Sequence, residues 1–219
     1  KAVIQTQNAI ELSYRTEEEG FHLTLTELFK GVNAIHDAPL IFEKFHGRAD
    51  LLQKNDSHSS VFGNFHYVVK EIKYAKNIKQ KHILQAAFYT HVIGKIQNYT
   101  PEYFYIINGD GEESRYSYKE HEDVIKQSIY NTNEIIMGKK IRPLYNSDFP
   151  WNNYSNVEAI RLEDVSLIYK LGHSIREKLN ALGIFTLDDL LNANKDGILA
   201  IKGISDTMYK QWMNQIVSL

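Results

Sequence analysis

The sequence predicts an α/β protein in which a mixed central sheet is flanked by helices and followed by a small all-α module. Two observations support this class. Helical and strand patterns follow one another along residues 7–139 in the order helix, strands, helix, strand, helix, which is typical of one mixed α/β unit. From about residue 158, short helical segments separated by glycines replace this order. We therefore expect a core at 1–142, a linker at 143–157 and a helical module at 158–219.

Each element of the core rests on its own pattern. Residues 7–32 predict a helix, because an acidic start precedes spaced apolar residues and Gly31 ends the segment. Residues 33–54 predict two short strands, and the polar segment 55–64 predicts a hairpin connection to a strand at 65–75. Amphipathic helices are expected at 79–97 and 117–139, with a strand and a turn at 101–111 between them. The stretch 141–156 contains two of the four prolines and has no periodicity, which predicts a linker.

Composition limits the functions that are open to this chain. Its 219 residues suffice for one good-sized domain, or for a medium domain and a small one. A hydrophobic content of 43% and a charged content of 24% are ordinary for a soluble globular protein. The net charge of −2 excludes a global basic field, so any binding of nucleic acid must use a local patch. No apolar run approaches the length of a membrane span, and no signal-peptide pattern is present, so we expect no membrane partner.

The chain contains no cysteine. This excludes disulfides, thiolate zinc sites and cysteine-ligated iron–sulfur clusters. It fits a reducing interior, and we expect a cytoplasmic location. Because the chain begins with Lys rather than Met, we also expect it to be part of a longer protein with further domains.

The predicted strand at 65–75 carries Glu71 and Lys73 in its middle, among mostly apolar residues. Residues two apart in a strand share a face, and a buried charge must be paired, hydrogen-bonded or bound to a metal. If 55–64 forms a hairpin, Asp50 lies on the neighbouring strand and can approach Glu71. Two carboxylates are suitable ligands for Mg²⁺, and a lysine beside them can orient or deprotonate a water. The pattern predicts a metal site for phosphodiester hydrolysis. The alternative is a salt bridge on a solvent-facing strand.

The helix that follows adds polar residues on one face. Gln85 and Tyr89 are four residues apart, and His82 lies on the same face. A local basic patch is formed by Lys70, Lys73, Lys76, Lys79 and Lys81. We expect Lys76 and Lys79 to contact DNA.

An Asp, a Glu-x-Lys strand and a helix with Gln-x-x-x-Tyr together resemble the RecB-like branch of the PD-(D/E)XK nuclease superfamily. Residues 28–52 through 101–111 look like the bacterial RecB-family nucleases that carry a helix-hairpin-helix segment after the nuclease core. The resemblance implies a restriction-endonuclease-like core and hydrolysis of DNA, dependent on Mg²⁺ or Mn²⁺, in DNA repair, recombination or processing. It implies that Asp50, Glu71 and the backbone carbonyl of Ile72 are metal ligands. Lys73 would activate water, and Gln85 and Tyr89 would form the helix motif near the DNA.

Relatives in this family often carry cysteines around a Trp after the second long helix, where they ligate an iron–sulfur cluster. The matching region, 145–155, contains Trp151 and no cysteine. The cluster is therefore expected to be absent, and packing of Trp151 on the nuclease core is expected to replace it.

The C-terminal stretches 169–191 and 198–212 look like paired helix-hairpin-helix motifs. A glycine permits the tight turn, and the amides at the next helix start can hold a DNA phosphate. The expected DNA contacts are Gly172 in one hairpin and Lys202, Gly203, Ile204 and Ser205 in the other. The alternative for this module is a helical bundle that acts as a spacer or protein contact. The alternatives for the whole chain are a non-catalytic nucleic-acid-binding or structural remnant of the same fold, and a metal-free protein-interaction domain.

Overall fold

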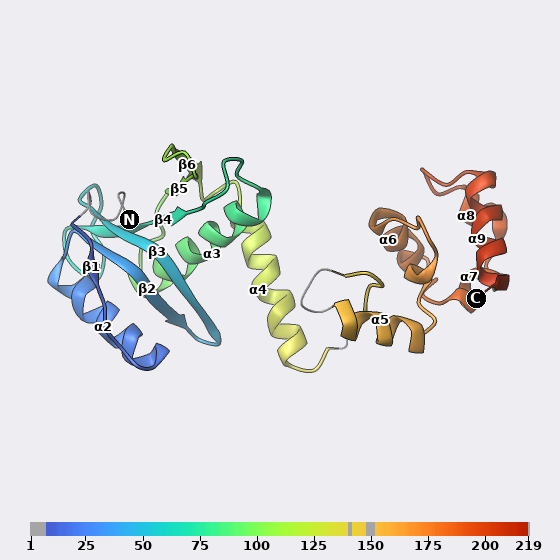
Figure 1. Ribbon diagram of the computed structural model, residues 1–219, viewed down its shortest axis with the longest axis horizontal. Helices are drawn as coiled ribbons and strands as arrows, with labels where there is room; N and C mark the ends of the chain where they lie inside the picture. Colours follow the sequence, from blue (N-terminus) through green and yellow to red (C-terminus); the bar gives the residue numbers. More distant parts are fainter. Residues whose placement is uncertain (1–7, 140–141, 148–151, 219) are drawn as a thin grey trace. The chain divides into compact units, whose positions relative to one another are not determined.

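The computed structural model describes residues 8–139, 142–147 and 152–218 (Figure 1). The chain forms two compact units, an N-terminal unit at Lys1–Ile136 and a C-terminal unit at Met137–Leu219. The coarse prediction is confirmed, because the N-terminal unit is α/β with a mixed six-stranded sheet and the described part of the C-terminal unit is helical. The boundary between the units falls six residues before the expected end of the core at 142.

The sheet of the N-terminal unit follows the order of the chain, β1-β2-β3-β4-β5-β6. Its strands are β1 (Ile10–Glu11), β2 (Ala34–Phe42), β3 (Phe45–Asn55), β4 (His66–Ile72), β5 (Tyr103–Ile107) and β6 (Glu113–Ser117). Strands β2, β3 and β4 are antiparallel neighbours, so the segment between β3 and β4 is the hairpin connection that the sequence predicts. Strands β4 and β5 are parallel, and such a pair needs a crossover connection.

Helix α3 (Gln80–Ile96) provides this crossover (Figure 1). In the chain it follows α2 (Glu17–Lys30) and precedes α4 (Glu122–Ile136). Residues of α2 and α3, among them Leu28 and Ala87, share one hydrophobic core with strands β2 to β5. The two helices therefore bury the same face of the sheet.

Two elements of this unit differ from the prediction. Helix α2 begins at Glu17 rather than near residue 7, because the side chain of Thr16 accepts a hydrogen bond from the amide of Glu19 and so caps the helix. The residues before it include the short strand β1. Strand β6 was not predicted, because its sequence ESRYS has no apolar alternation; it lies at an edge of the sheet and is largely exposed.

Strand β4 is buried on both of its faces from His66 to Glu71. Tyr67 and Val69 belong to the core beneath the helices, whereas Val68 does not. Since successive residues of a strand point to opposite faces, Glu71 lies on the helix-covered face and Lys70 on the other. The charged strand is thus a central strand of the sheet, with Lys70 and Glu71 on different faces.

The described part of the C-terminal unit consists of short helices around a separate core. They are α5 (Asn152–Arg161), a 3-10 turn η1 (Val165–Leu167), α6 (His173–Ala181), α7 (Leu187–Asn192), α8 (Lys195–Leu199) and α9 (Asp206–Ser218). Trp212, Leu179 and Leu190 are buried in the core of this unit. Thr186 caps α7, since its side chain accepts a hydrogen bond from the amide of Asp189.

The expected linker at 143–157 is wrong in part, because α5 begins at Asn152. The preceding residues 142–147 are also held by the C-terminal unit. Asp164, which has no exposed surface, accepts hydrogen bonds from the guanidinium groups of Arg142 and Arg176, and Arg176 also donates to the carbonyl of Pro143. Such a buried network fixes a segment that lacks apolar periodicity. Trp151 lies outside the described residues.

Among the helices that the structure describes, none combines the length and apolar character that a membrane crossing requires.

Candidate functional site: paired carboxylates beside a lysine

The structure brings Asp50 and Glu71 together at the end of β4. Leu51 pairs with Lys70 in the antiparallel ladder of β3 and β4, and continuing that register by one residue places Asp50 opposite Glu71. A side-chain oxygen of Asp50, Oδ2, accepts a hydrogen bond of 2.7 Å from the backbone amide of Ile72. This contact fixes the Asp50 carboxylate beside the strand that carries Glu71.

The carboxylate of Glu71 is buried and only half satisfied. Its side chain is 1% exposed, and Oε1 accepts a hydrogen bond of 2.6 Å from Nζ of Lys73. The second oxygen, Oε2, is buried without a hydrogen-bond partner in the described part of the chain. An unsatisfied buried carboxylate oxygen is unfavourable and needs a reason, such as a bound cation or water.

Burial raises the pKa of Glu71 to about 7, while the hydrogen bond and charge of Lys73 oppose the increase. The negative charge of Asp50 and a side-chain hydrogen bond between the two carboxyl groups, which requires a proton on one of them, add to the increase. A neighbouring carboxylate and a low-polarity environment both disfavour the ionised form of Glu71. A cation between them would remove that penalty. The raised pKa of a buried carboxyl group is a common property of functional sites.

A chain of hydrogen bonds runs from Lys73 into helix α3. Nζ of Lys73 donates to Oε1 of Gln85 at 3.0 Å, and Nε2 of Gln85 donates to the hydroxyl of Tyr89 at 3.1 Å. Gln85 and Tyr89 meet because residues four apart lie on one helix face. Tyr89 packs against Gly47 of β3, where a Cβ atom would lie 2.5 Å from the ring. Glycine at this position lets the tyrosine approach the sheet.

Strand β3 is irregular at the point where it presents Asp50. Ala49 and Leu52 are three residues apart, yet both belong to the core beneath the helices, so the alternation of faces is interrupted between them. The β2–β3 pairing also omits Asp50 and Asp37, and Asp37 has a positive φ of 52°. Interruptions of this kind change the direction of a side chain and are frequent next to active sites.

The donor set fits a hard divalent cation such as Mg²⁺. Asp50 and Glu71 supply carboxylate oxygens, one of them already without a partner. The amide of Ile72 points toward β3, and its carbonyl is expected on the same side because both groups of one strand residue face the same neighbour. The described residues contain no group of three or more Asp, Glu, His or Cys side chains that could hold a metal. The remaining ligands would therefore be water and substrate oxygens.

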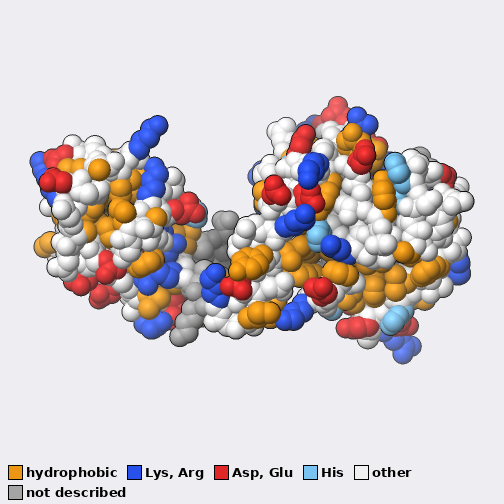
Figure 2. Space-filling view, turned by 180° about the vertical axis from the view of Figure 1, so that it is seen from behind, with side chains coloured by type: hydrophobic (Ala, Val, Ile, Leu, Met, Phe, Trp, Pro, Cys, Tyr) orange, Lys and Arg blue, Asp and Glu red, His pale blue; other side chains and the backbone are white. Residues whose placement is uncertain are grey.

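The predicted lysine patch is only partly assembled. Lys73 lies in the site, but Lys70 faces the other side of the sheet and pairs with Glu113 at 2.6 Å. Lys76 is exposed and forms an ion pair of 2.9 Å with Asp110, and Lys79 is exposed at the start of α3. In Figure 2, Lys and Arg side chains on the visible face of this unit are mixed with Asp and Glu and lie beside a belt of hydrophobic side chains. This face carries no continuous basic field.

The glycines of the two predicted hairpins have different roles. Gly172 precedes α6 with a negative φ of −68°, whereas Gly203 has a φ of +105° in the turn between α8 and α9. The amide of Ile204 already donates to the carbonyl of Ile201, and its side chain belongs to the core of this unit. The expectation that Ile204 offers a free amide to DNA is therefore wrong.

Ser205 and Lys202, which were also predicted to contact DNA, lie in the same turn. The hydroxyl of Ser205 accepts from the amide of Met208 and caps α9. The side chain of Lys202 is exposed, while its carbonyl accepts a hydrogen bond of 2.7 Å from Nζ of Lys178. Lys202 therefore offers a phosphate an exposed cationic side chain in this turn.

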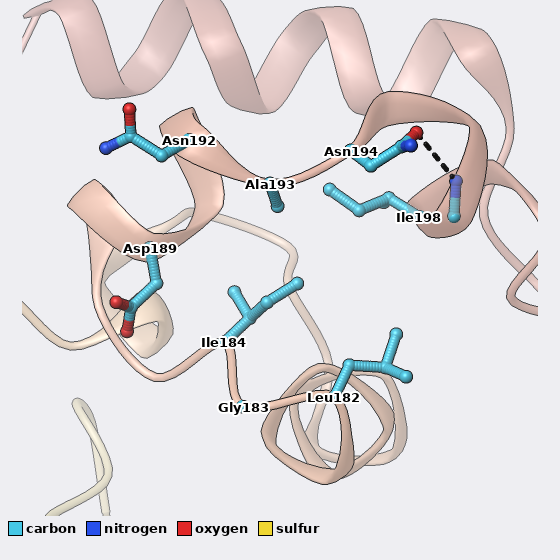
Figure 3. A pocket seen from close by; sticks show the side chains of 9 residues that line it. Leu182, Gly183, Ile184, Asp189, Asn192, Ala193, Asn194 and Ile198 are labelled. Atoms are coloured by element: carbon cyan, nitrogen blue, oxygen red, sulfur yellow. Dashed lines mark hydrogen bonds between the residues drawn. The ribbon is translucent and has the colours of Figure 1, made fainter.

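A shallow pocket in the same unit lies between the end of α6, α7 and α8 (Figure 3). Its polar side chains act within the protein. Asp189 accepts from the amides of Phe185 and Thr186, and Asn194 accepts from the amides of Asp196 and Gly197. These are helix-capping bonds, so the pocket offers few free groups to a ligand.

Sequence reasoning did not foresee the bond between Asp50 and the Ile72 amide or the contact between Gly47 and Tyr89. The first involves a backbone group, which has no residue-type signal, and the second depends on how α3 lies against β3. Comparison with protein-family models and with curated protein sequences finds no match for this chain.

Proposed function

We propose that the N-terminal unit is a metal-dependent nuclease that hydrolyses DNA phosphodiester bonds. The observation that carries the proposal is the buried oxygen Oε2 of Glu71, which has no hydrogen-bond partner among the described residues and lies in a carboxylate placed opposite Asp50. The ion pair with Lys73 satisfies only Oε1 of Glu71, and the hydrogen bond from the Ile72 amide satisfies only Oδ2 of Asp50. The resemblance of the ordered residues to RecB-like nucleases also supports the proposal.

Asp50, Glu71 and the carbonyl of Ile72 would hold Mg²⁺ or Mn²⁺. When bound, the cation supplies charge that stabilises the phosphoryl oxygens and lowers the pKa of a bound water. Lys73 orients the attacking water, because its ammonium group is next to the carboxylate of Glu71 at 2.6 Å. Gln85 and Tyr89 hold Lys73 in place through their hydrogen bonds, which is a positioning role.

The C-terminal unit would act as a helix-hairpin-helix module that holds DNA through its backbone. Support comes from the positive φ of Gly203 in the turn that precedes α9, and from the exposed side chain of Lys202 beside it. Lys202→Ala should weaken DNA binding and reduce the salt slope of binding by about one. Lys44→Ala, at the exposed tip of the β2–β3 hairpin, is the matched control. An unchanged salt slope for Lys202→Ala would favour a spacer role.

Metal binding and cleavage should be measured on the same proteins. Calorimetry with Mn²⁺ and cleavage of single-stranded DNA, duplex DNA and RNA would be compared for the wild type, Asp50→Asn and Glu120→Gln. Asp50→Asn should lose both metal binding and cleavage, because it removes a charged oxygen ligand. Glu120 is an exposed carboxylate before α4, and its replacement should change neither.

Two outcomes would contradict the proposal. Cleavage that survives in Asp50→Asn would place the activity elsewhere. Absence of both Mn²⁺ binding and cleavage in the wild type would favour the non-catalytic remnant of the same fold.

A further inference from the structure

The sheet of the N-terminal unit carries a second group of polar and aromatic side chains on the face opposite Glu71. His66 on β4 alternates with Tyr67 and Val69 of the core beneath the helices, so it points to the other face. On β5, Tyr103 and Tyr105 alternate in the same way with core residues and point to this second face.

A pocket of about 140 Å³ opens among these side chains. Residues that line it include His58, His66, Tyr99, Glu102, Tyr103 and Tyr105. Pockets for drug-sized ligands are roughly 300–1,000 Å³. This one therefore has room for a single small ring system and not for a larger ligand.

His66 gives the pocket a hydrogen-bond acceptor. His66 is only 3% exposed, and its Nδ1 is 3.1 Å from the carbonyl oxygen of His58. Because a carbonyl can only accept, Nδ1 carries the proton and Nε2 carries a lone pair. Within the described residues, Nε2 has no hydrogen-bond partner. Burial also lowers the pKa of His66, which favours this neutral form.

Glu102 adds a second acceptor at the exposed rim of the pocket. Tyr99 and Glu102 both line the pocket, and burial and, to a smaller extent, the charge of Glu102 raise the pKa of Tyr99. A carboxylate repels phosphate, but it accepts hydrogen bonds from the amino group of a nucleobase, as at N4 of cytosine. The pocket therefore favours a base that carries an amino group.

The surroundings of the pocket suit the rest of a single strand. Tyr103 is 37% exposed, and the guanidinium of Arg115 lies 4.4 Å from the centre of its ring. Exposed aromatic rings stack unpaired bases, and a neighbouring Arg can contact the backbone phosphate. Arg115 is itself exposed on the edge strand β6.

We propose that this pocket binds one unpaired, amino-bearing nucleobase of a single-stranded nucleic acid. The proposal rests on the function proposed above, and it deepens that function by naming a strand with unpaired bases as the substrate. A duplex would not fit, because its bases are stacked and paired, and the pocket must receive the edge of a free base.

The test measures binding of the full chain by fluorescence anisotropy in EDTA, where no metal-dependent cleavage occurs. Labelled oligo(dC), oligo(dT) and a duplex are compared at low salt, and free dCMP is titrated separately. Oligo(dC) should bind more tightly than oligo(dT) or duplex. Tyr103→Ala should weaken the binding of oligo(dC) by about 5- to 150-fold, the usual range for loss of one stacked base. Tyr130→Ala, an exposed tyrosine of α4, is the control and should bind as the wild type does.

A second variant tests base recognition at a side chain that is exposed and so does not endanger folding. Glu102→Gln should reduce the preference for oligo(dC) over oligo(dT). Equal binding of oligo(dC) by the wild type, Tyr103→Ala and Glu102→Gln would overturn the proposal. Binding of dCMP as tight as that of oligo(dC) would overturn the single strand as the occupant and assign the pocket to a free nucleotide.

The two proposals fail separately, because this binding needs neither metal nor cleavage. Loss of binding in the pocket variants, together with no cleavage by the wild type, would keep the base site and reject the nuclease. Cleavage that depends on Asp50, together with unchanged binding in the pocket variants, would keep the nuclease and reject the base site.

Discussion

Replacing Glu71 with Gln should stabilise the metal-free N-terminal unit at alkaline pH and at the same time remove a metal ligand. The raised pKa of Glu71, about 7, exceeds the ordinary value of 4.5 mainly because of burial. The unfolded chain therefore loses this proton at lower pH than the folded protein does. The contribution of Glu71 to stability is greatest below 4.5, falls as the pH rises through the interval from 4.5 to about 7, and is constant above it.

The size of this effect follows from the same two values. The difference between 4.5 and about 7 corresponds to roughly 3 kcal/mol of destabilisation once Glu71 is ionised. Gln has nearly the same shape, keeps an acceptor for Lys73 and carries no charge. The variant should thus match the wild type near pH 4 and exceed it at pH 8 by up to roughly 3 kcal/mol, or about 10 °C in the melting temperature.

Calorimetry can follow this change because the units have separate reporters. Trp212 is buried in the core of the C-terminal unit, so in a Trp151→Phe background the tryptophan fluorescence reports on that unit. A transition seen by calorimetry and absent from this fluorescence therefore belongs to the N-terminal unit. Addition of Mn²⁺ should raise the melting temperature of this transition in the wild type and leave Glu71→Gln unchanged, because a ligand stabilises only the protein that binds it.

The reasoning would be refuted by a Glu71→Gln protein that is less stable than the wild type at pH 8. A stability difference that is the same at pH 4 and pH 8 would also contradict it, since the effect depends on ionisation of Glu71. Glu120→Gln, which removes an exposed carboxylate, should show no such pH dependence.

Three further predictions follow from particular contacts. Lys73→Ala should abolish cleavage and retain Mn²⁺ binding by calorimetry, because it removes the group that orients water and leaves both carboxylates; retained cleavage would exclude this role. Gly47→Ala should lower kcat roughly tenfold or more while the unit stays folded by circular dichroism, because the new Cβ would lie 2.5 Å from the ring of Tyr89 and displace it. Asp164→Asn should destabilise the C-terminal unit by about 3–5 kcal/mol in tryptophan-monitored unfolding, since it leaves Arg176 buried without its counter-charge. Burial opposes ionisation of Asp164, but hydrogen bonds from Arg176 and Ser166 outweigh it and lower its pKa, so the deficit should be complete at pH 7 and shrink as the pH falls through that lowered pKa.

Local sequence determined those elements that a short run of residues specifies through its apolar spacing or its end signals. Gly31 marks the end of α2 as predicted, although the start of this helix at Glu17, after the cap Thr16, was not predicted. The apolar spacing of 79–97 gives α3 to within one residue at each end. The Glu71–Lys73 contact is also local, because a strand places residues two apart on one face. The polar edge strand β6 and the helix α5 carry no such periodicity, and the sequence alone gave neither of them.

Tertiary structure decided which of the charged residues meet. Asp50 reaches Glu71 only through the register of β3 against β4, and its carboxylate is fixed by a backbone amide that every residue type possesses. Lys70 and Lys73 look alike in the sequence, yet the pleat of β4 places Lys70 on the opposite face, beside Glu113. The same pleat turns His66 toward a pocket formed with β5. These pairings depend on burial and strand register between distant segments, and residue types in one local stretch do not specify them.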